Sequence, residues 1–238
     1  MGITRSGASI DSVLVAGATG LVGRSLLLHL LEHHACEHVL VLARHAAPDA
    51  LVGRRKLTWQ QVDFARLAEL PLPPLDAAFI ALGTTIKAAG SEAAFRAVDF
   101  DHVVAVAQAA RKAGASRLAV VSALGADASS RVFYNRVKGE TEAALTGLGF
   151  ESLVMAQPSL LVGDRRALGQ PTRRGEMLAT RLLGPVMGLV PRRVRPIAAA
   201  DVAAAMVAAI LAGPPGARRL SSAQMQGASS AGPVAGSG

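Results

Sequence analysis

The sequence has few of the residues on which several kinds of site depend. Its 238 residues include a single cysteine, Cys36, which excludes a disulfide framework and a cysteine-based zinc site. Aromatic residues make up only 3% of the chain, with one tryptophan and one tyrosine. Because so few rings cannot build a stacking platform for single strands, we expect no nucleic-acid partner despite the formal net charge of +8.

A long hydrophobic run and a secretory signal are also missing. The longest apolar stretch, residues 196–213, is interrupted by Asp201 and is too short for a comfortable membrane span. Residues 1–12 have no apolar core of the signal-peptide type. Since a single cysteine also suits a reducing compartment, we expect a cytoplasmic protein without a membrane span.

Apolar residues, in contrast, are abundant at 51% of the chain, which excludes disorder of the whole chain. Strand-like runs alternate with helical patterns. The predicted strands are residues 12–16, 38–43, 57–62, 76–82, 117–122 and 152–156. The predicted helices are residues 21–34, 91–113, 132–148, 176–187 and 197–211. This alternation predicts βαβ units, and therefore an α/β doubly wound parallel sheet with helices on both faces.

The domain organisation follows from a change in composition at residue 164. We expect one domain over residues 10–212, of which residues 164–212 form a small carboxyl-terminal segment on the substrate side. The remaining residues, 213–238, are rich in glycine, serine, alanine and proline. We expect them to form a tail with a disordered end.

A glycine-rich turn lies between the first predicted strand and the first predicted helix. Glycines at positions 17, 20 and 23 allow a tight turn, close approach to a pyrophosphate and close packing of the helix. The alternative is a purely structural turn, but the placement in a βαβ unit favours dinucleotide binding. We expect cofactor contacts from Gly17, Thr19, Gly20, Leu21, Val22 and Gly23.

The residue after the second strand indicates which dinucleotide binds. An acidic residue there would accept the ribose 2′-hydroxyl of NAD, but the sequence has Arg44, which can pair with a 2′-phosphate. NADP(H) is therefore favoured over NAD(H), and a solvent-facing arginine is the alternative. Asp63, after the third strand, is a candidate for the adenine amino group or a plain surface carboxylate.

Ser122, Tyr134 and Lys138 form the candidate catalytic group. Ser122 ends a predicted strand, while Tyr134 and Lys138 are four residues apart and share one face of a predicted helix. A phenol is a poor acid or base at neutral pH, but a neighbouring ammonium stabilises its phenolate. The serine hydroxyl can hold a substrate carbonyl or alcohol beside the phenol. An incidental Tyr–Lys contact is the alternative.

Several longer motifs resemble one family. They are Leu82-Gly-Thr-Thr85, Phe95-Arg-Ala-Val-Asp-Phe-Asp101, Val121-Ser-Ala-Leu-Gly-Ala-Asp127, Phe133-Tyr-Asn-Arg-Val-Lys-Gly-Glu-Thr-Glu142 and Arg174-Gly-Glu176. With the glycine turn, they resemble the atypical short-chain dehydrogenase/reductases, in particular the Tat-interacting-protein-type oxidoreductases. The resemblance runs from about residue 12 to residue 210.

This resemblance implies a Rossmann fold, NADPH binding and a site of the carbonyl reductase or alcohol dehydrogenase type. It implies that Tyr134 is the acid–base, that Lys138 also holds the nicotinamide ribose, and that Leu82, Gly83 and Thr84 lie along the cofactor. Two departures matter. Gln157-Pro158-Ser159 stands where the branch usually has Arg-Pro-Gly, so we expect altered contacts near the nicotinamide, with Pro158 among them. The superfamily's usual relay asparagine is not evident, and Asp99 and Asp101 are nearby but not equivalent.

Two remaining features have plainer interpretations. His29 with His33 and His34 with His38 have metal-ligand spacing, but no carboxylate or cysteine set completes a site, so we expect no metal. Residues 164–195 hold eight arginines against two carboxylates. They could attract an anionic substrate, and a solvated basic surface is the alternative.

The sequence therefore predicts an NADPH-dependent short-chain-type oxidoreductase that transfers hydride between the nicotinamide and a small carbonyl or alcohol. The alternative is a non-catalytic NADPH-binding regulatory or sensor protein, because fold alone does not separate the two. A homodimer is compatible with the sequence.

Overall fold

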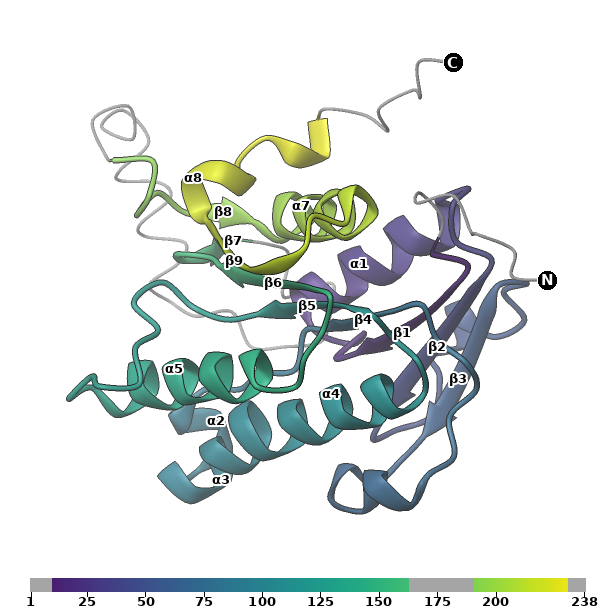
Figure 1. Cartoon of the computed structure of the whole chain (residues 1–238), viewed down its shortest axis with the longest axis horizontal. Helices are drawn as coiled ribbons and strands as arrows, with labels where there is room; N and C mark the ends of the chain where they lie inside the picture. The colour runs from purple at the N-terminus through teal and green to yellow at the C-terminus, as the bar shows by residue number, and fades with distance from the viewer. Residues whose placement is uncertain (1–9, 163–190, 231–238) are drawn as a thin grey trace.

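Seven parallel strands form the main sheet, in the order β3-β2-β1-β4-β5-β6-β9 (Figure 1). The computed structural model describes residues 10–162 and 191–230. The strands are β1 (Ser12–Ala16), β2 (His38–Ala43), β3 (Leu57–Gln61), β4 (Ala77–Ile80), β5 (Arg117–Val121), β6 (Ser152–Gln157) and β9 (Gly216–Ser221). The chain thus has the doubly wound, Rossmann-type α/β fold that the alternation of its elements predicts.

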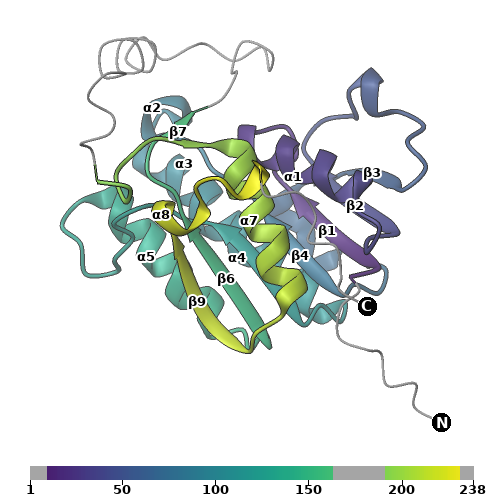
Figure 2. The same ribbon diagram turned by 90° about the horizontal axis from the view of Figure 1, so that it is seen from above.

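Helices cover both faces of this sheet. The longer ones are α1 (Leu21–Glu32), α4 (His102–Lys112), α5 (Phe133–Thr146) and α7 (Ala199–Ala212). Helices α1 and α7 lie on one face, and α4 and α5 lie on the other (Figures 1 and 2). Because both faces are covered, the central strands are continuous apolar runs, and every residue of β4 is buried.

Shorter elements complete the described part. They are α2 (Ile86–Ala89), α3 (Glu92–Arg96), α8 (Ser222–Met225), the 3₁₀ turns η1 (Asp49–Leu51), η2 (Phe64–Glu69) and η6 (Ala228–Ser230), and the π-helical segment η3 (Ala97–Asp101). Two further strands, β7 (Leu161–Val162) and β8 (Ile197–Ala198), pair as a small parallel ribbon.

The strand order places one crevice at the carboxyl edge of the sheet. β1 pairs with β2 on one side and with β4 on the other, so the chain winds outward in opposite directions from this point. In open α/β sheets ligands bind beyond the strand ends at such a switch point. The glycine turn after β1 and the residues after β4 therefore face the same crevice.

The helix predicted at residues 91–113 contains an interruption. It consists of α3, the π-helical segment η3 and α4 in continuous succession. A π-helical turn holds an extra residue, which rotates the side chains that follow it. In this segment Asp99 is completely buried, and the Thr141 hydroxyl of α5 donates to its backbone carbonyl at 3.0 Å. Periodicity alone gave no sign of this turn.

The region predicted as a tail contains the seventh strand. β9 pairs in parallel with β6 over six residues, so the sheet extends past residue 212 (Figure 2). Its sequence, Gly-Ala-Arg-Arg-Leu-Ser, has no apolar run because an edge strand is only partly covered. Its first arginine, Arg218, donates through Nη2 to the carbonyl of Ala209 near the end of α7 at 2.7 Å.

The predicted substrate-side segment, residues 164–212, is only partly described. Residues 163–190, which include the predicted helix 176–187 and most of the arginine cluster, lie outside the described residues. The described helix α7 packs against α1 and supplies Val202, Met206 and Ile210 to the core. That helix therefore covers the sheet and is the crossover between β6 and β9.

Candidate active site

The glycine turn after β1 is shaped by close backbone contacts. Gly17 has a φ of +90°, and a Cβ there would lie 2.5 Å from the carbonyl carbon of Ala81, which follows β4. A Cβ on Gly23 would lie 1.9 Å from the carbonyl oxygen of Gly17. These two glycines therefore let the turn rest against the end of β4 and let α1 rest against the turn.

Gly20 has a different environment, which fits a phosphate group. A Cβ on Gly20 would meet a single atom within 4 Å, the Gly17 carbonyl oxygen at 3.4 Å, so its other side is open. Gly20 is the N-cap of α1, and no side chain caps the helix. The amides of Leu21, Val22 and Gly23 precede the first hydrogen bond of the helix, as first-turn amides do. Beside exposed Thr19 they form a cradle that suits a pyrophosphate.

The residues after β4 contact a buried ion pair. The Lys138 Nζ of α5 lies 2.7 Å from Oδ1 of Asp99, and both side chains are almost fully buried. The backbone amide of Thr84 donates to the other Asp99 oxygen at 2.8 Å. Gly83 lies against the pair, because a Cβ on it would lie 3.9 Å from the Lys138 Nζ. Leu82, Gly83 and Thr84 are thereby brought together with Lys138.

Asp99 is the site residue that sequence reasoning missed. From the sequence it is near, but not equivalent to, the relay asparagine of the superfamily. The π-helical turn carries its carboxylate to Lys138, and an aspartate among apolar residues of a helix was the one available signal. The ion pair is electrically neutral as a unit, and it fixes the direction of the ammonium group.

Tyr134 lies on the first turn of α5, one turn before Lys138, so the two side chains share a helix face. The Tyr134 ring is partly buried, and its centroid lies 5.4 Å from that of Phe95. Helix α5 is packed tightly on the loop after β5, since a Cβ on Gly139 would lie 2.1 Å from the Ala128 nitrogen. This contact holds the Ser122 loop and the Tyr134 helix together.

Ser122 follows β5 directly, and its hydroxyl is already engaged. Its Oγ donates to Glu142 Oε1 at 2.5 Å, and both residues are buried. The sequence suggested only that Ser122 faces the substrate. Pro158, after β6, is buried beside it, and its carbonyl accepts from the Leu124 amide at 3.0 Å. Ser122 and Pro158 therefore lie at neighbouring strand ends.

Arg44 and Asp63 lie on the opposite side of the glycine turn, after β2 and β3. Both are exposed, and one Asp63 oxygen accepts from the Ala65 amide at 3.0 Å, capping η2. Burial lowers the pKa of His102, the Arg44 charge lowers it further, and Asp101 and Asp63 oppose this. The two predicted residues and His102 thus share one neighbourhood at the start of α4.

The histidines and the cysteine show no sign of a metal or redox site. Among residues 10–162 and 191–230, no group of three or more histidine, cysteine or acidic side chains could hold a metal ion. The His33 and His34 rings stack at 4.8 Å, and burial together with the neighbouring cations lowers the pKa of His33. Burial raises the pKa of the Cys36 thiol to about 11, so this thiol is a poor nucleophile.

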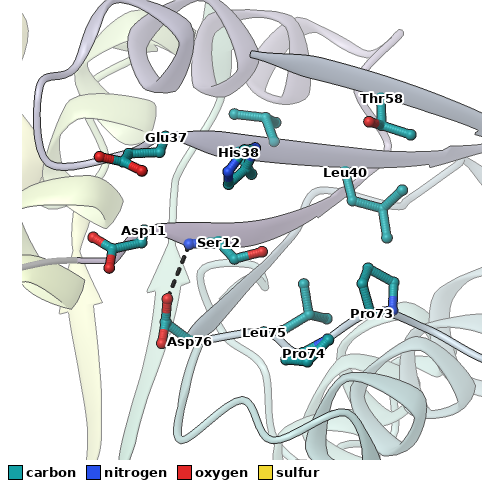
Figure 3. Close-up of a pocket in the computed structure, with 11 residues that line it drawn as sticks. Asp11, Ser12, Glu37, His38, Leu40, Thr58, Pro73, Pro74, Leu75 and Asp76 are labelled. Atoms are coloured by element: carbon teal, nitrogen blue, oxygen red, sulfur yellow. Dashed lines mark hydrogen bonds between the residues drawn. The ribbon is translucent and has the colours of Figure 1, made fainter. Parts of the chain in front are cut away.

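A hollow of about 560 Å³ lies at the other, amino-terminal edge of the sheet. It is lined by the starts of β1 and β2 and by the chain before β4 (Figure 3). Within it the Ser12 amide donates to Asp76 Oδ2 at 2.9 Å, which ties β1 to β4. Since the glycine turn and the start of α5 both lie at the opposite edge, this hollow is separate from the candidate site.

Comparison with known proteins agrees with this geometry. A family model described as NAD(P)H-binding matches residues 17–146. Protein HTATIP2 of Rattus norvegicus is 35% identical over 185 residues, which cover 73% of this chain and 70% of the relative. The mitochondrial protein FMP52 of Eremothecium gossypii is 35% identical over 190 residues, which cover 74% of this chain and 83% of the relative. The resemblance to the Tat-interacting-protein type is thereby confirmed.

Solved structures share the fold at low sequence identity. The 3-oxoacyl-[acyl-carrier protein] reductase from Brucella melitensis, solved in complex with NAD, matches with a TM-score of 0.66 and 16% identity. The match covers 91% of this chain and 98% of that one. At this identity the likeness supports the Rossmann-type fold alone.

The expected cytoplasmic location is wrong by the same comparisons. Relatives from Eremothecium gossypii, Emericella nidulans, Candida albicans and Aspergillus fumigatus are named as mitochondrial proteins. The composition of residues 1–12 and the single cysteine do not distinguish a mitochondrial protein from a cytoplasmic one. No helix in the described part of the chain is long and apolar enough to cross a membrane.

Replacing Gly20 by alanine should separate cofactor binding from stability. The added methyl group makes only an ordinary contact with the Gly17 carbonyl oxygen, at 3.4 Å, but it enters the open side of the cradle. We therefore expect NADPH to bind at least about tenfold more weakly at a nearly unchanged melting temperature. Calorimetry and thermal unfolding measure the two effects. Gly23→Ala is the contrasting variant, because its clash with the Gly17 carbonyl should lower the stability by about 1–3 kcal/mol. Equal NADPH affinity for Gly20→Ala and wild type would contradict the assignment.

Replacing Asp99 by asparagine should destabilise the protein. The change keeps the shape but leaves the buried Lys138 ammonium without its counter-charge, which costs about 3–5 kcal/mol in the free energy of unfolding. Urea unfolding measures this loss. Asp101→Asn, two residues further on at an exposed position, should change the stability by less than about 0.5 kcal/mol. Similar stability of the two variants would argue against a structural ion pair.

Proposed function

Because the chain belongs to the NAD(P)H-binding family and is related to HTATIP2 and FMP52, we propose that it is an NADPH-dependent oxidoreductase of the short-chain type. Its substrate is a small carbonyl compound or the corresponding alcohol. The observation that carries the proposal is the buried Lys138–Asp99 pair, which lies one helical turn from Tyr134 and against the cofactor-side residue Gly83. A protein that only binds the dinucleotide has no need of a phenol at this position.

Each residue has a defined part in this chemistry. The bound dinucleotide supplies or accepts the hydride. In the reductive direction Tyr134 Oη gives its proton to the substrate oxygen, and in the oxidative direction it takes that proton back. The Lys138 ammonium, aimed by Asp99, stabilises the phenolate left after proton transfer and is expected to hold the nicotinamide ribose. Ser122 faces the substrate oxygen beside the phenol.

The preference for NADPH rests on the chain after β2. Arg44 is exposed where the adenosine ribose of a Rossmann-bound dinucleotide lies, and its guanidinium can pair with a 2′-phosphate through two hydrogen bonds. Asp63, like Arg44, lies close to His102, but one of its oxygens already caps η2. Asp63 is therefore proposed for the adenine amino group through its second oxygen.

Tyr134→Phe tests the chemistry. We expect turnover to fall by at least about 100-fold, because the variant has no proton to exchange. NADPH affinity should stay within about twofold, because the phenol does not contact the phosphates. The consumption of reduced cofactor, followed by its absorbance over a panel of small carbonyls, gives the first value, and calorimetry gives the second. Full activity of the variant would refute the mechanism. Tight NADPH binding by the wild type without turnover of any carbonyl would favour a sensor.

Arg44→Gln tests the cofactor preference. We expect NADPH to bind about tenfold more weakly and NADH to bind as before, because only NADPH has the 2′-phosphate that a charge-assisted pair would hold. Arg54→Gln removes a second exposed arginine, in the turn before β3, and should leave both affinities unchanged. If Arg44→Gln weakened both dinucleotides equally, Arg44 would not be the specificity residue.

A further inference from the structure

Glu142 is a buried carboxylate that receives hydrogen bonds from three other elements. The Ser122 hydroxyl after β5 donates to Oε1 at 2.5 Å, and Gln157 Nε2 at the end of β6 donates to the same oxygen at 2.8 Å. Arg219 Nε of β9 donates to Oε2 at 2.7 Å. Glu142 is two helical turns from Tyr134 and one from Lys138, so it continues the same face of α5.

The three donors define the charge of this group. A carboxylate with donors on both oxygens, one of them a guanidinium, is held in its ionised, acceptor-only form. Its side chain is only 2% exposed, so it needs a charged partner, and Arg219 supplies one. The Arg219 side chain is 60% exposed, which leaves most of that cation in water.

The hydrogen bond to Glu142 restricts what Ser122 can do. A serine hydroxyl has one proton and two lone pairs. With the proton directed at Glu142, only lone pairs remain for the substrate side. Ser122 can then accept a hydrogen bond from a substrate hydroxyl, but it cannot donate one to a substrate carbonyl.

We infer that Glu142, balanced by Arg219, is a positioning residue that makes Ser122 a hydrogen-bond acceptor toward the substrate oxygen. The inference rests on the proposed function, because it needs a substrate oxygen at Ser122. An alcohol then gains two hydrogen bonds in the site, one accepted from the Tyr134 hydroxyl and one donated to Ser122. A carbonyl gains only the first. The site therefore binds the alcohol form more tightly than the carbonyl form.

Glu142→Gln reverses this arrangement without a change of shape. Arg219 can only donate, so the amide oxygen of the new side chain must face it, and the amide NH₂ group faces Ser122 and Gln157. The Gln157 amide turns over and accepts from this NH₂ group through its own oxygen. Ser122 then accepts from the amide and directs its own proton at the substrate. The matched control is Glu140→Gln, on the same helix, whose carboxylate pairs with Arg96 on the partly exposed side of α5.

The test measures binding without turnover. Cyclohexanol is titrated into the complex with reduced cofactor and cyclohexanone into the complex with oxidised cofactor, so that neither reacts. For the wild type and for Glu140→Gln we expect cyclohexanol to bind more tightly than cyclohexanone. For Glu142→Gln we expect the ratio of the two dissociation constants to shift toward the ketone by about fivefold, because the ketone gains one neutral hydrogen bond from Ser122 while the alcohol only exchanges a donated bond for an accepted one.

Ser122→Ala shows whether Glu142 acts through Ser122. In that background the additional Glu142→Gln change should leave the ratio of dissociation constants unaltered, whereas a merely structural role would shift it equally in both backgrounds. A wild type without preference for cyclohexanol, including one that binds neither probe, overturns the inference, as does an unchanged ratio in Glu142→Gln. An active Tyr134→Phe variant would refute the proposed function instead, so the two failures are distinguishable.

Discussion

The ion pair between the Lys138 ammonium and the Asp99 carboxylate is the interaction on which the arrangement of the candidate site depends. It joins a helix that follows β5 to a π-helical segment that follows β4, and it does so where water hardly reaches. A buried pair is stable only when its geometry is good and its remaining hydrogen-bonding positions are occupied. The Thr84 amide occupies the second oxygen of Asp99, and the Thr141 hydroxyl donates to the backbone carbonyl of Asp99. The loop after β4 is therefore fixed by the same carboxylate that directs the lysine.

This pair also changes how the lysine acts on the phenol. An isolated ammonium would present a full positive charge to Tyr134, but Asp99 makes the unit neutral overall. In the proposed mechanism it would act on the phenol as an oriented dipole, whose effect falls off faster with distance than that of a single charge. The position of Lys138 relative to Tyr134 then matters more than its charge alone, and the rigid turn of α5 between them sets that position.

Much of the fold could be predicted from the sequence, because β-branched runs and helical spacing are local signals. The first six strands, the glycine turn and the Tyr134–Lys138 helix face follow from such patterns. The features that could not be predicted depend on contacts between residues that are distant in sequence. β9 has no apolar run since it lies at an edge, and the π-helical turn is set by packing against α5. Glu142 looks like any helical surface glutamate until Ser122, Gln157 and Arg219 converge on it from three strands. The cellular compartment could not be predicted, because the packing of the core does not depend on it.

The contribution of β9 has a consequence for the order in which the protein becomes functional. The glycine turn, the Lys138–Asp99 pair and Tyr134 all belong to the first 138 residues, whereas Arg219 leaves the ribosome some eighty residues later. During synthesis the dinucleotide half can assemble first, with Glu142 still lacking its cation and the strand end of β6 still uncovered. The buried carboxylate that accepts from Ser122 thus gains its counter-charge only when the last strand of the sheet docks.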